Sequence, residues 1–182
     1  MTAVDISLTV INMMAELSSQ THPALNFMHM NVCSLEFPDE SFDAVIAKAT
    51  MDVIMCGEGS VGNVAKMCFE VSRVLRPGGV FFVVSHEKDY MQYLDPETVR
   101  RNRIISSGRP REGGGGSSLR IERDSRATRR QAQANKDFGW SVTQETVLKP
   151  CLNPKLLPTD EKGNLLVHHI YICKKKSDHG TT

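Results

Sequence analysis

The residues best suited to chemistry follow apolar stretches, at points where strands are expected to end. Asp5 closes the stretch TAVD, Asn31 follows LNFMHM, and the segment AKATMD with Lys48 and Asp52 ends a third apolar run. Open α/β sheets bind ligands outside the carboxyl ends of their strands, where an acidic side chain can accept hydrogen bonds from both hydroxyls of a ribose. From the residues alone, Asp5 fits two roles equally: such an acceptor, or a cap of the next helix alongside Ser7.

Apolar periodicity predicts the helices and strands that position these residues. A helix is expected from Leu8 to Ser18, since Leu8, Ile11, Met14 and Leu17 form a stripe that should pack on a sheet. Strands are expected over 25–30, 42–47 and 80–85, with a helix over 62–75 and room for another after residue 49. RPGG at 76–79 should end the 62–75 helix in a turn. The class predicted is α/β with a parallel sheet, closed at one edge by an antiparallel pair from 138–148 and 164–176.

The composition is that of an ordinary globular protein. Of the 182 residues 40% are hydrophobic and 24% charged, and no apolar run approaches the roughly 20 residues of a membrane-spanning helix. The start lacks the features of a secretory signal, so the cytoplasm is the expected compartment, with the mitochondrial matrix as the alternative. Five scattered cysteines without a C-x-x-C pair predict neither a disulfide framework nor a metal site.

One segment carries most of the positive charge. Residues 100–137 hold 11 Lys and Arg against 4 Asp and Glu, although the whole chain has a net charge of +1. Four consecutive glycines and a lack of aromatic residues predict a disordered insertion over 104–136. It divides the expected domain into 1–103 and 137–174, and 175–182 is expected to be a tail.

Several motifs together resemble a known family. They are VDIS with VINMM, LEFPDESFDAVIAKATMDVIMCGE, EVSRVLRPGG and HHIYICKKK. They are similar to class I S-adenosylmethionine-dependent methyltransferases, and more narrowly to the group that contains the lysine methyltransferases of elongation factor 1-alpha and of citrate synthase. The likeness covers 3–95 and 138–174. RVLRPGG is shared by very many methyltransferases, whereas FDAVIAKATMD is the narrower signal.

The resemblance implies a Rossmann-like sheet with S-adenosylmethionine as cofactor. Asp5 and Ile6 then lie against the cofactor's ribose. Asn31 stands where family members usually carry an aspartate that accepts from the adenine amino group, and a neutral amide makes a weaker bond there. Val32 offers its backbone N–H to the adenine ring, and Lys48 contacts the cofactor or the substrate.

The resemblance also implies the catalytic candidates Lys48, Thr50 and Asp52. A substrate lysine amine, with a pKa of about 10.4, must lose its proton before it can accept a methyl group, and Asp52 is the proposed acceptor. The family usually shows Lys-Gly-Thr-Leu-Asp here. This chain has Ala49 in place of the glycine, and because alanine disfavours a left-handed conformation, a shifted loop is expected.

One family feature has no counterpart in this sequence. Relatives carry an earlier strand that ends in a Gly-rich loop of the G-x-G type, and the run 113–116 is no substitute because it follows no strand and opens no helix. In these sheets that strand lies between those expected at 2–5 and at 42–47. Its absence predicts a gap or a wrong pairing, with exposed strand edges. The chain is then expected to be either an N-terminally truncated methyltransferase whose activity is doubtful or a divergent chain that pairs with something else.

Three functional hypotheses follow. The first is protein-lysine methylation. The alternative is an inactive methyltransferase-like protein that contacts RNA or an acidic partner through the basic insertion; interleaved acidic residues and missing aromatic residues favour a solvated loop instead, so nucleic acid is not the expected partner. A hydrolase is the third, since Ser85 and His86 are adjacent, but no G-x-S-x-G motif supports it.

Overall fold

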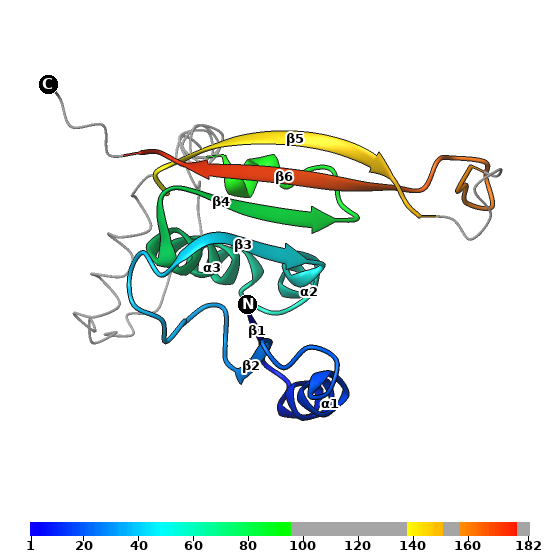
Figure 1. The fold of residues 1–182 in the computed structure, drawn as a ribbon. Coiled ribbons are helices and arrows are strands. Elements are labelled where there is room, and N and C mark those ends of the chain that lie inside the picture. Colours follow the sequence, from blue (N-terminus) through cyan, green and yellow to red (C-terminus); the bar gives the residue numbers. More distant parts are fainter. Residues whose placement is uncertain (96–137, 151–156, 178–182) are drawn as a thin grey trace, which may run out of the picture.

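The computed structural model describes residues 1–95, 138–150 and 157–177. Helices and strands alternate along most of this chain (Figure 1). In order they are β1 (Thr2–Asp5), α1 (Leu8–Ser18), β2 (Asn26–His29), β3 (Phe42–Lys48), α2 (Thr50–Met55), α3 (Ser60–Val74), β4 (Leu75–Ser85), α4 (Met91–Leu94), β5 (Trp140–Leu148) and β6 (Val167–Lys175). The α/β class predicted from the sequence is confirmed. The predicted insertion over 104–136 lies outside the described residues, as do the domain boundaries next to it.

The strands form two separate sheets. Four of them form a sheet in the order β3-β4-β6-β5, in which β3 and β4 are parallel while β6 runs antiparallel to both β4 and β5. The predicted antiparallel pair therefore does close one edge of the sheet. The other sheet is the parallel pair β1-β2, with Asp5 opposite His29.

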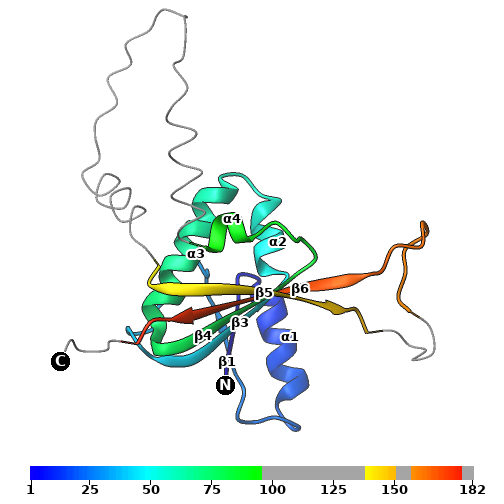
Figure 2. The same cartoon turned by 90° about the horizontal axis from the view of Figure 1, so that it is seen from above.

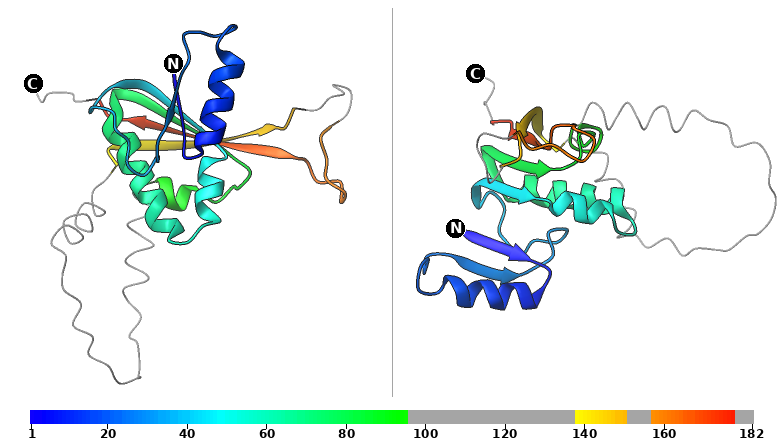
Figure 3. Two further views of the ribbon diagram at one scale, coloured as in Figure 1. Left: turned by 90° about the horizontal axis from the view of Figure 1, so that it is seen from below. Right: turned by 90° about the vertical axis from the view of Figure 1, so that its right-hand side faces the viewer.

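The position between β1 and β3 is unfilled by any strand of the described residues. β1 pairs only with β2, and β3 pairs only with β4. Figure 3 shows β1 as the strand of its pair that lies nearer β3, with both arrows pointing the same way. Two outcomes were expected for this position, a gap between the strands or a wrong strand pairing. Among the described residues the structure shows a gap between β1 and β3.

The core lies between the four-stranded sheet and the helices α2, α3 and α4. The alternating residues Phe81, Val83 and Ser85 of β4 face it and are almost fully buried, as are Tyr171 and Cys173 of β6. From α3 the core takes one face of the helix, as its periodicity predicts: Val64, Met67, Cys68, Val71 and Val74. Figure 2 shows these three helices on one side of the sheet and α1 on the other.

The predicted packing of α1 is wrong in its extent. Of the stripe Leu8, Ile11, Met14 and Leu17, only Ile11 is buried, while Leu8 is 55% and Leu17 66% exposed. The periodicity identified the helix correctly, because α1 has the predicted bounds. A two-stranded sheet offers too small a surface to cover the whole stripe, which explains the exposed residues.

The strand β4 begins earlier than the sequence suggests. The helix ends at Val74, and Leu75 is already extended, so RPGG forms the start of the strand rather than a separate turn. Gly78 still has a left-handed φ of 79°, and a Cβ on Gly79 would lie 2.8 Å from the Arg76 carbonyl oxygen. Both glycines are therefore required by local geometry, at the bulge between β3 and β4.

Arg73 holds the loop after β2 against α3. Its guanidinium donates to the carbonyl oxygens of Leu35 and Phe37, at 2.8 and 2.7 Å. It also pairs with Glu70, whose carboxylate accepts the Leu35 N–H at 2.7 Å. These bonds link the β1-α1-β2 part of the chain to the main core.

Candidate cofactor and active site

The predicted site residues all lie at the carboxyl ends of parallel strands. The arrowheads of β1, β2, β3 and β4 point to the same edge of the molecule (Figure 3). Asp5 and Asn31 follow the two strands of the small sheet, and Lys48 with Asp52 follows the first strand of the large one. The structure thus brings the candidates into two groups at one edge, separated by the unfilled strand position.

Asp5 contributes to the start of α1 only through Ser7, the residue that caps the helix. Its Oδ1 accepts the backbone N–H of Ser7 at 2.7 Å, while Ser7 itself caps α1 by accepting the Val10 N–H. The other oxygen, Oδ2, has no hydrogen bond to any described residue. Ile6 is 69% exposed, and its carbonyl oxygen lies 2.9 Å from His29 Nε2. Asp5 therefore orients the N-cap residue Ser7 with one carboxylate oxygen and leaves the other oxygen without a donor among the described residues.

Asn31 is partly engaged by its own turn. Its side-chain oxygen accepts the Cys33 N–H at 2.9 Å, and its backbone oxygen accepts the Ser34 N–H. An amide oxygen has a second lone pair, so it can accept a further hydrogen bond from a ligand in addition to the one from Cys33. Val32 is half-buried and packs against the core cluster, which fixes the backbone next to Asn31.

The expectation of a shifted loop at Ala49 is wrong. Ala49 adopts the left-handed conformation, with φ 59° and ψ 0°, as the N-cap of α2. Its N–H donates to the Val84 carbonyl oxygen at 2.9 Å, and its own carbonyl oxygen accepts from Val53. These bonds and the fully buried Met51 hold the backbone in the left-handed conformation, although the Cβ of an alanine makes that conformation unfavourable.

Replacing Ala49 with glycine is expected to stabilise the protein by about 1 kcal/mol. A left-handed conformation costs an alanine roughly 1–2 kcal/mol, and glycine avoids this cost. Part of the gain is offset because unfolded glycine has a larger backbone entropy, which favours the unfolded state. Urea unfolding followed by circular dichroism measures the change. Ala44→Gly, in the middle of β3, is the matched control and should destabilise. A lower stability for Ala49→Gly would contradict the assigned conformation.

Asp52 lies at the centre of a hydrogen-bond network that joins α2, β4 and the loop after β4. Its Oδ1 accepts the Ser85 hydroxyl at 2.5 Å and the Tyr90 hydroxyl at 2.8 Å. Its Oδ2 is buried and has no partner in the described part of the chain. A buried carboxylate oxygen without a donor is costly, and an N–H or O–H group of a water molecule or of a ligand would satisfy it.

Tyr90 is held firmly in this network. Burial first, and then the hydrogen bond to Asp52, raises the pKa of its hydroxyl well above the ordinary value, so it stays a proton donor. Its backbone N–H donates to the Tyr171 hydroxyl, which in turn donates to the Glu87 carbonyl oxygen at 2.7 Å. The carboxylate of Asp52 is thus oriented by residues that are themselves fixed.

The roles of Ser85 and Tyr90 in this network were not predicted from the sequence. Ser85 ends β4, next to the end of β3, so the rule that ligands bind at carboxyl ends of strands would have identified it. Nothing in the sequence signals Tyr90, because only the fold of the 86–90 loop brings its hydroxyl to Asp52.

Lys48 is exposed at the end of β3. No acidic side chain pairs with it among the described residues. Lys48 lies close enough to His168 to affect that histidine: burial lowers the pKa of His168 most, and His86, Lys149 and Lys48 lower it further. The ring of His86 lies 5.0 Å from that of His168. The roles assigned to Lys48 stay predictions.

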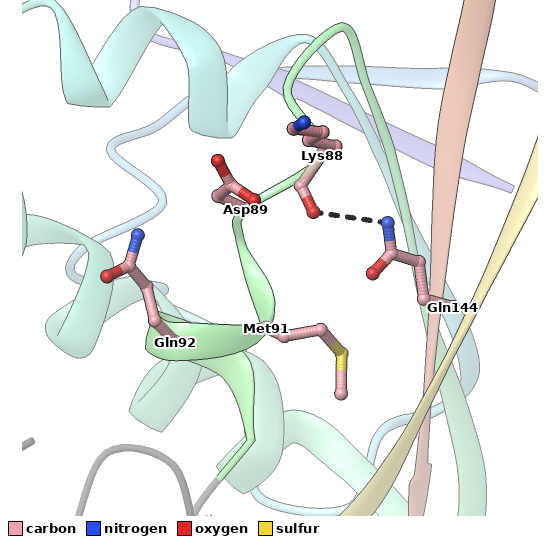
Figure 4. Close-up of a pocket in the computed structure, with 5 residues that line it drawn as sticks. All are labelled: Lys88, Asp89, Met91, Gln92 and Gln144. Carbon is pink, nitrogen blue, oxygen red and sulfur yellow. Dashed lines mark hydrogen bonds between the residues drawn. The ribbon is translucent and has the colours of Figure 1, made fainter.

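A shallow hollow lies beside the loop that carries Tyr90. It measures about 530 Å³ and is lined by Lys88, Asp89, Met91, Gln92 and Gln144 (Figure 4). The Gln144 side chain donates to the Lys88 carbonyl oxygen at 3.1 Å, which ties the loop to β5. Asp52 does not line this hollow.

Known proteins match this fold and these motifs. Residues 1–83 match a family model described as a methyltransferase domain. Residues 1–83 carry this methyltransferase domain, and the fold is that of S-adenosylmethionine-dependent methyltransferases. S-adenosylmethionine is the cofactor of this family.

The curated relatives of the methyltransferase domain share a named activity. The human eEF1A lysine and N-terminal methyltransferase is 37% identical over 84 residues, which are 45% of this chain and 12% of that protein. Mouse EEF1A lysine methyltransferase 4 is 38% identical over 88 residues, 44% of this chain and 34% of that protein. The chain thus corresponds to a small part of these relatives.

Solved structures support the fold alone. A methyltransferase from Methanosarcina mazei superimposes with a TM-score of 0.54 at 18% identity, covering 97% of this chain and 82% of that one. The [4+2]-cyclase SpnF superimposes with a TM-score of 0.52 at 15% identity, covering 97% and 66%. Since a cyclase has the same fold, the reaction must be argued from the site.

The residues of the methyltransferase domain fit the cofactor in part. Asp5 has a free carboxylate oxygen at the end of β1, where a ribose is expected, and Asn31 and Val32 lie at the end of the neighbouring strand.

Among the described residues, no helix has both the length and the apolar character that a membrane-spanning segment needs.

Proposed function

We propose that this chain transfers a methyl group from S-adenosylmethionine to a lysine side chain of a protein in the cytoplasm, with the elongation factor eEF1A as the first candidate. The names of relatives at 37–38% identity support the substrate class. The observation that carries the proposal is the buried, unpartnered Oδ2 of Asp52 at the carboxyl end of the sheet. A lysine amine supplies the N–H donors that this oxygen lacks.

Asp5, Ile6, Asn31, Val32 and Lys48 would hold the cofactor. Asp5 Oδ2 would accept from the ribose hydroxyls, Asn31 would accept from the adenine amino group, and the backbones of Ile6 and Val32 would lie against these groups. Lys48 would contact the cofactor or the substrate. When bound, the cofactor supplies an electrophilic methyl group.

Asp52 would bind the substrate amine and take its proton. A free lysine, with a pKa of about 10.4, is protonated at neutral pH and cannot attack until the proton is removed. Ser85 and Tyr90 both donate to Oδ1, so Oδ2 would be the oxygen that binds the amine. Thr50, two residues earlier on α2, is a candidate contact of the same lysine. The polypeptide around that lysine would lie along the hollow at Lys88 and Gln144, next to the loop that carries Tyr90.

Replacing Asp5 with alanine is expected to weaken cofactor binding about tenfold or more, because a charge-assisted hydrogen bond is worth roughly 1.5–3 kcal/mol. Isothermal titration calorimetry with S-adenosylmethionine measures the dissociation constant. Glu16→Ala, an exposed acid on α1, is the matched control. Since Asp5 also holds Ser7, the N-cap of α1, thermal unfolding of both variants separates lost binding from lost structure. An unchanged dissociation constant in folded Asp5→Ala would contradict the assigned ribose site.

Methylation itself is tested by incubating the chain with purified eEF1A and S-adenosylmethionine. Mass spectrometry of the digested substrate should reveal methylated lysine. Modification of its N-terminus alone, or no modification of eEF1A while other lysine-containing proteins are methylated, would contradict the candidate substrate.

A further inference from the structure

Each strand of the four-stranded sheet contributes one basic side chain at the same end of the sheet. Lys48 ends β3, His86 follows β4, His168 lies near the start of β6, and Lys149 follows β5. Figure 1 shows that the ends of β3, β4 and β5 and the start of β6 lie toward one edge of the molecule. These four residues are called the basic end below.

The strand register places the side chains of the basic end on one face, the one turned away from α3. Lys48 lies opposite Val84, and Val84 lies opposite Ile170. His86 comes two residues after Val84, and His168 two residues before Ile170. Side chains two residues apart in extended chain point to the same side. Lys48, His86 and His168 therefore share this face.

Lys149 belongs to the same face. Val147 lies opposite His168 in the ladder between β5 and β6, and Lys149 comes two residues later. The Lys149 N–H donates to the Leu166 carbonyl oxygen at 3.0 Å, so the ladder continues one residue beyond β5. The alternation of side chains consequently holds as far as Lys149.

His168 lies at the centre of the basic end. The ring of His86 is 5.0 Å from its own ring, between centroids. Lys149 and Lys48, on the strands to either side, are both close enough to lower its pKa, after burial and His86. The four basic groups are thus held near one another by strands that are distant in the sequence.

The basic end has no counter-charge among the described residues. Neither Lys48 nor Lys149 takes part in the ion pairs of this part of the chain. Glu145 lies on the same face but opposite Ile170, four residues before Lys149. The Nδ1 atom of His168 is buried and has no hydrogen-bond partner in the part described. Several like charges without a counter-charge attract an anionic group.

The basic end lies next to the candidate active site. The Ser85 hydroxyl donates to Asp52 on the helix side of the sheet, and His86 is the next residue. Lys48 directly precedes Ala49, the N-cap of the helix that carries Asp52. Successive residues of an extended chain are about 3.3 Å apart. One extended polypeptide can therefore reach both Asp52 and the basic end.

The surroundings of the basic end favour a polypeptide as ligand. Val147 is 39% and Leu166 36% exposed, and both lie on the same face beside His168 and Lys149. Exposed apolar groups next to charged groups are typical of surfaces that bind other proteins. A peptide segment can offer an acidic and an apolar side chain together, whereas a nucleic acid backbone offers phosphates alone.

We propose that the basic end binds an acidic side chain of the protein substrate, located within about four residues of the target lysine. Lys48 and Lys149 would pair with the carboxylate, and His168 would donate a hydrogen bond to it. The inference rests on the proposed function, because the target lysine is the one bound at Asp52. It adds a sequence preference to that function and assigns Lys48 to the substrate.

The test measures binding to the full chain and does not require methyl transfer. The probes are short synthetic peptides with one lysine in an uncharged background of valine, serine and glycine. An aspartate is placed in turn at each position near the lysine, with asparagine at the same position as the reference. We expect at least one aspartate peptide to bind about tenfold more tightly than its asparagine reference by calorimetry, the effect of one charge-assisted hydrogen bond.

Variants locate the preference on the protein. Lys149→Gln should abolish the preference for aspartate. Lys174→Gln is the matched control and should keep it, because Lys174 is an exposed lysine of β6 at the opposite end of the sheet. Lys149→Glu should reverse the preference, so that a peptide with arginine in place of the aspartate binds more tightly. Binding by the reversed pair also shows that the variant is folded.

Several results would overturn the proposal. They are a lack of binding by every peptide, equal affinities of the aspartate and asparagine peptides, and a preference that survives in Lys149→Gln. A tenfold loss of affinity for S-adenosylmethionine in Lys149→Gln would instead identify the carboxylate of the cofactor as the ligand. Binding of a polyuridylate oligonucleotide that is lost in Lys149→Gln, without any peptide preference, would identify a nucleic acid.

The failure of this inference differs from the failure of the proposed function. An aspartate preference without methylation of any lysine would contradict the proposed function and leave the basic end as a binding site. Methylation of lysine peptides at equal efficiency with aspartate or asparagine would contradict the inference and leave the proposed function intact.

Discussion

Replacing Trp140 with alanine is expected to destabilise the protein by about 3–5 kcal/mol, the range for large aromatic side chains in a core. Trp140 is 1% exposed and packs against Phe81 and Phe138, with ring centroids 5.7 and 5.2 Å away. Its indole N–H donates to the Leu94 carbonyl oxygen at 3.0 Å, which would lose its partner. Such a loss is a large part of the roughly 5–15 kcal/mol that stabilises a domain.

Urea unfolding measures this effect, followed by circular dichroism because Trp140 is the only tryptophan. Trp140→Phe keeps an aromatic ring and loses only the hydrogen bond and part of the volume, so a smaller loss is expected. Thr143→Ala, at an exposed position of the same strand, controls for strand propensity. If Trp140→Ala cost no more than Thr143→Ala, the description of the core would be wrong.

Replacing Asp52 with asparagine is expected to lower the rate of lysine methylation about 100-fold, at the low end of what a positioned acid or base contributes. The amide oxygen can still accept from Ser85 and Tyr90, so the geometry is kept. The buried Oδ2 becomes an N–H₂ group, which can neither accept from the substrate amine nor take its proton. Cofactor affinity and the free energy of unfolding should change little.

The measurement is kcat and KM with eEF1A as substrate, beside calorimetry with S-adenosylmethionine. Asp43→Asn is the control, because Asp43 is an exposed carboxylate on β3, paired with Arg76 at 2.6 Å. Full activity in Asp52→Asn would exclude Asp52 as the proton acceptor. A loss caused by weaker cofactor binding would place Asp52 in the cofactor site instead.

Much of the fold could be predicted because its signals are local. The helix α3 and the strand β4 follow from apolar periodicity over a few residues, and α1 begins at the predicted cap Ser7. The candidates Asp5, Asn31 and Lys48 were found because strand ends are visible in the sequence. The extent to which α1 is buried was not predictable. Its apolar stripe indicates that the helix packs on another surface, but it does not indicate how large that surface is.

Tertiary structure decided the rest, because the remaining features depend on contacts between distant residues. Ala49 is left-handed because Val84 and the buried Met51 hold it there, against its own local preference. The unpartnered oxygen of Asp52 exists only because Ser85 and Tyr90, 33 and 38 residues away, both donate to the other oxygen. The sequence by itself determined the elements and the polar residues at their ends. Only folding determined which of those groups are satisfied and which have no partner among the described residues.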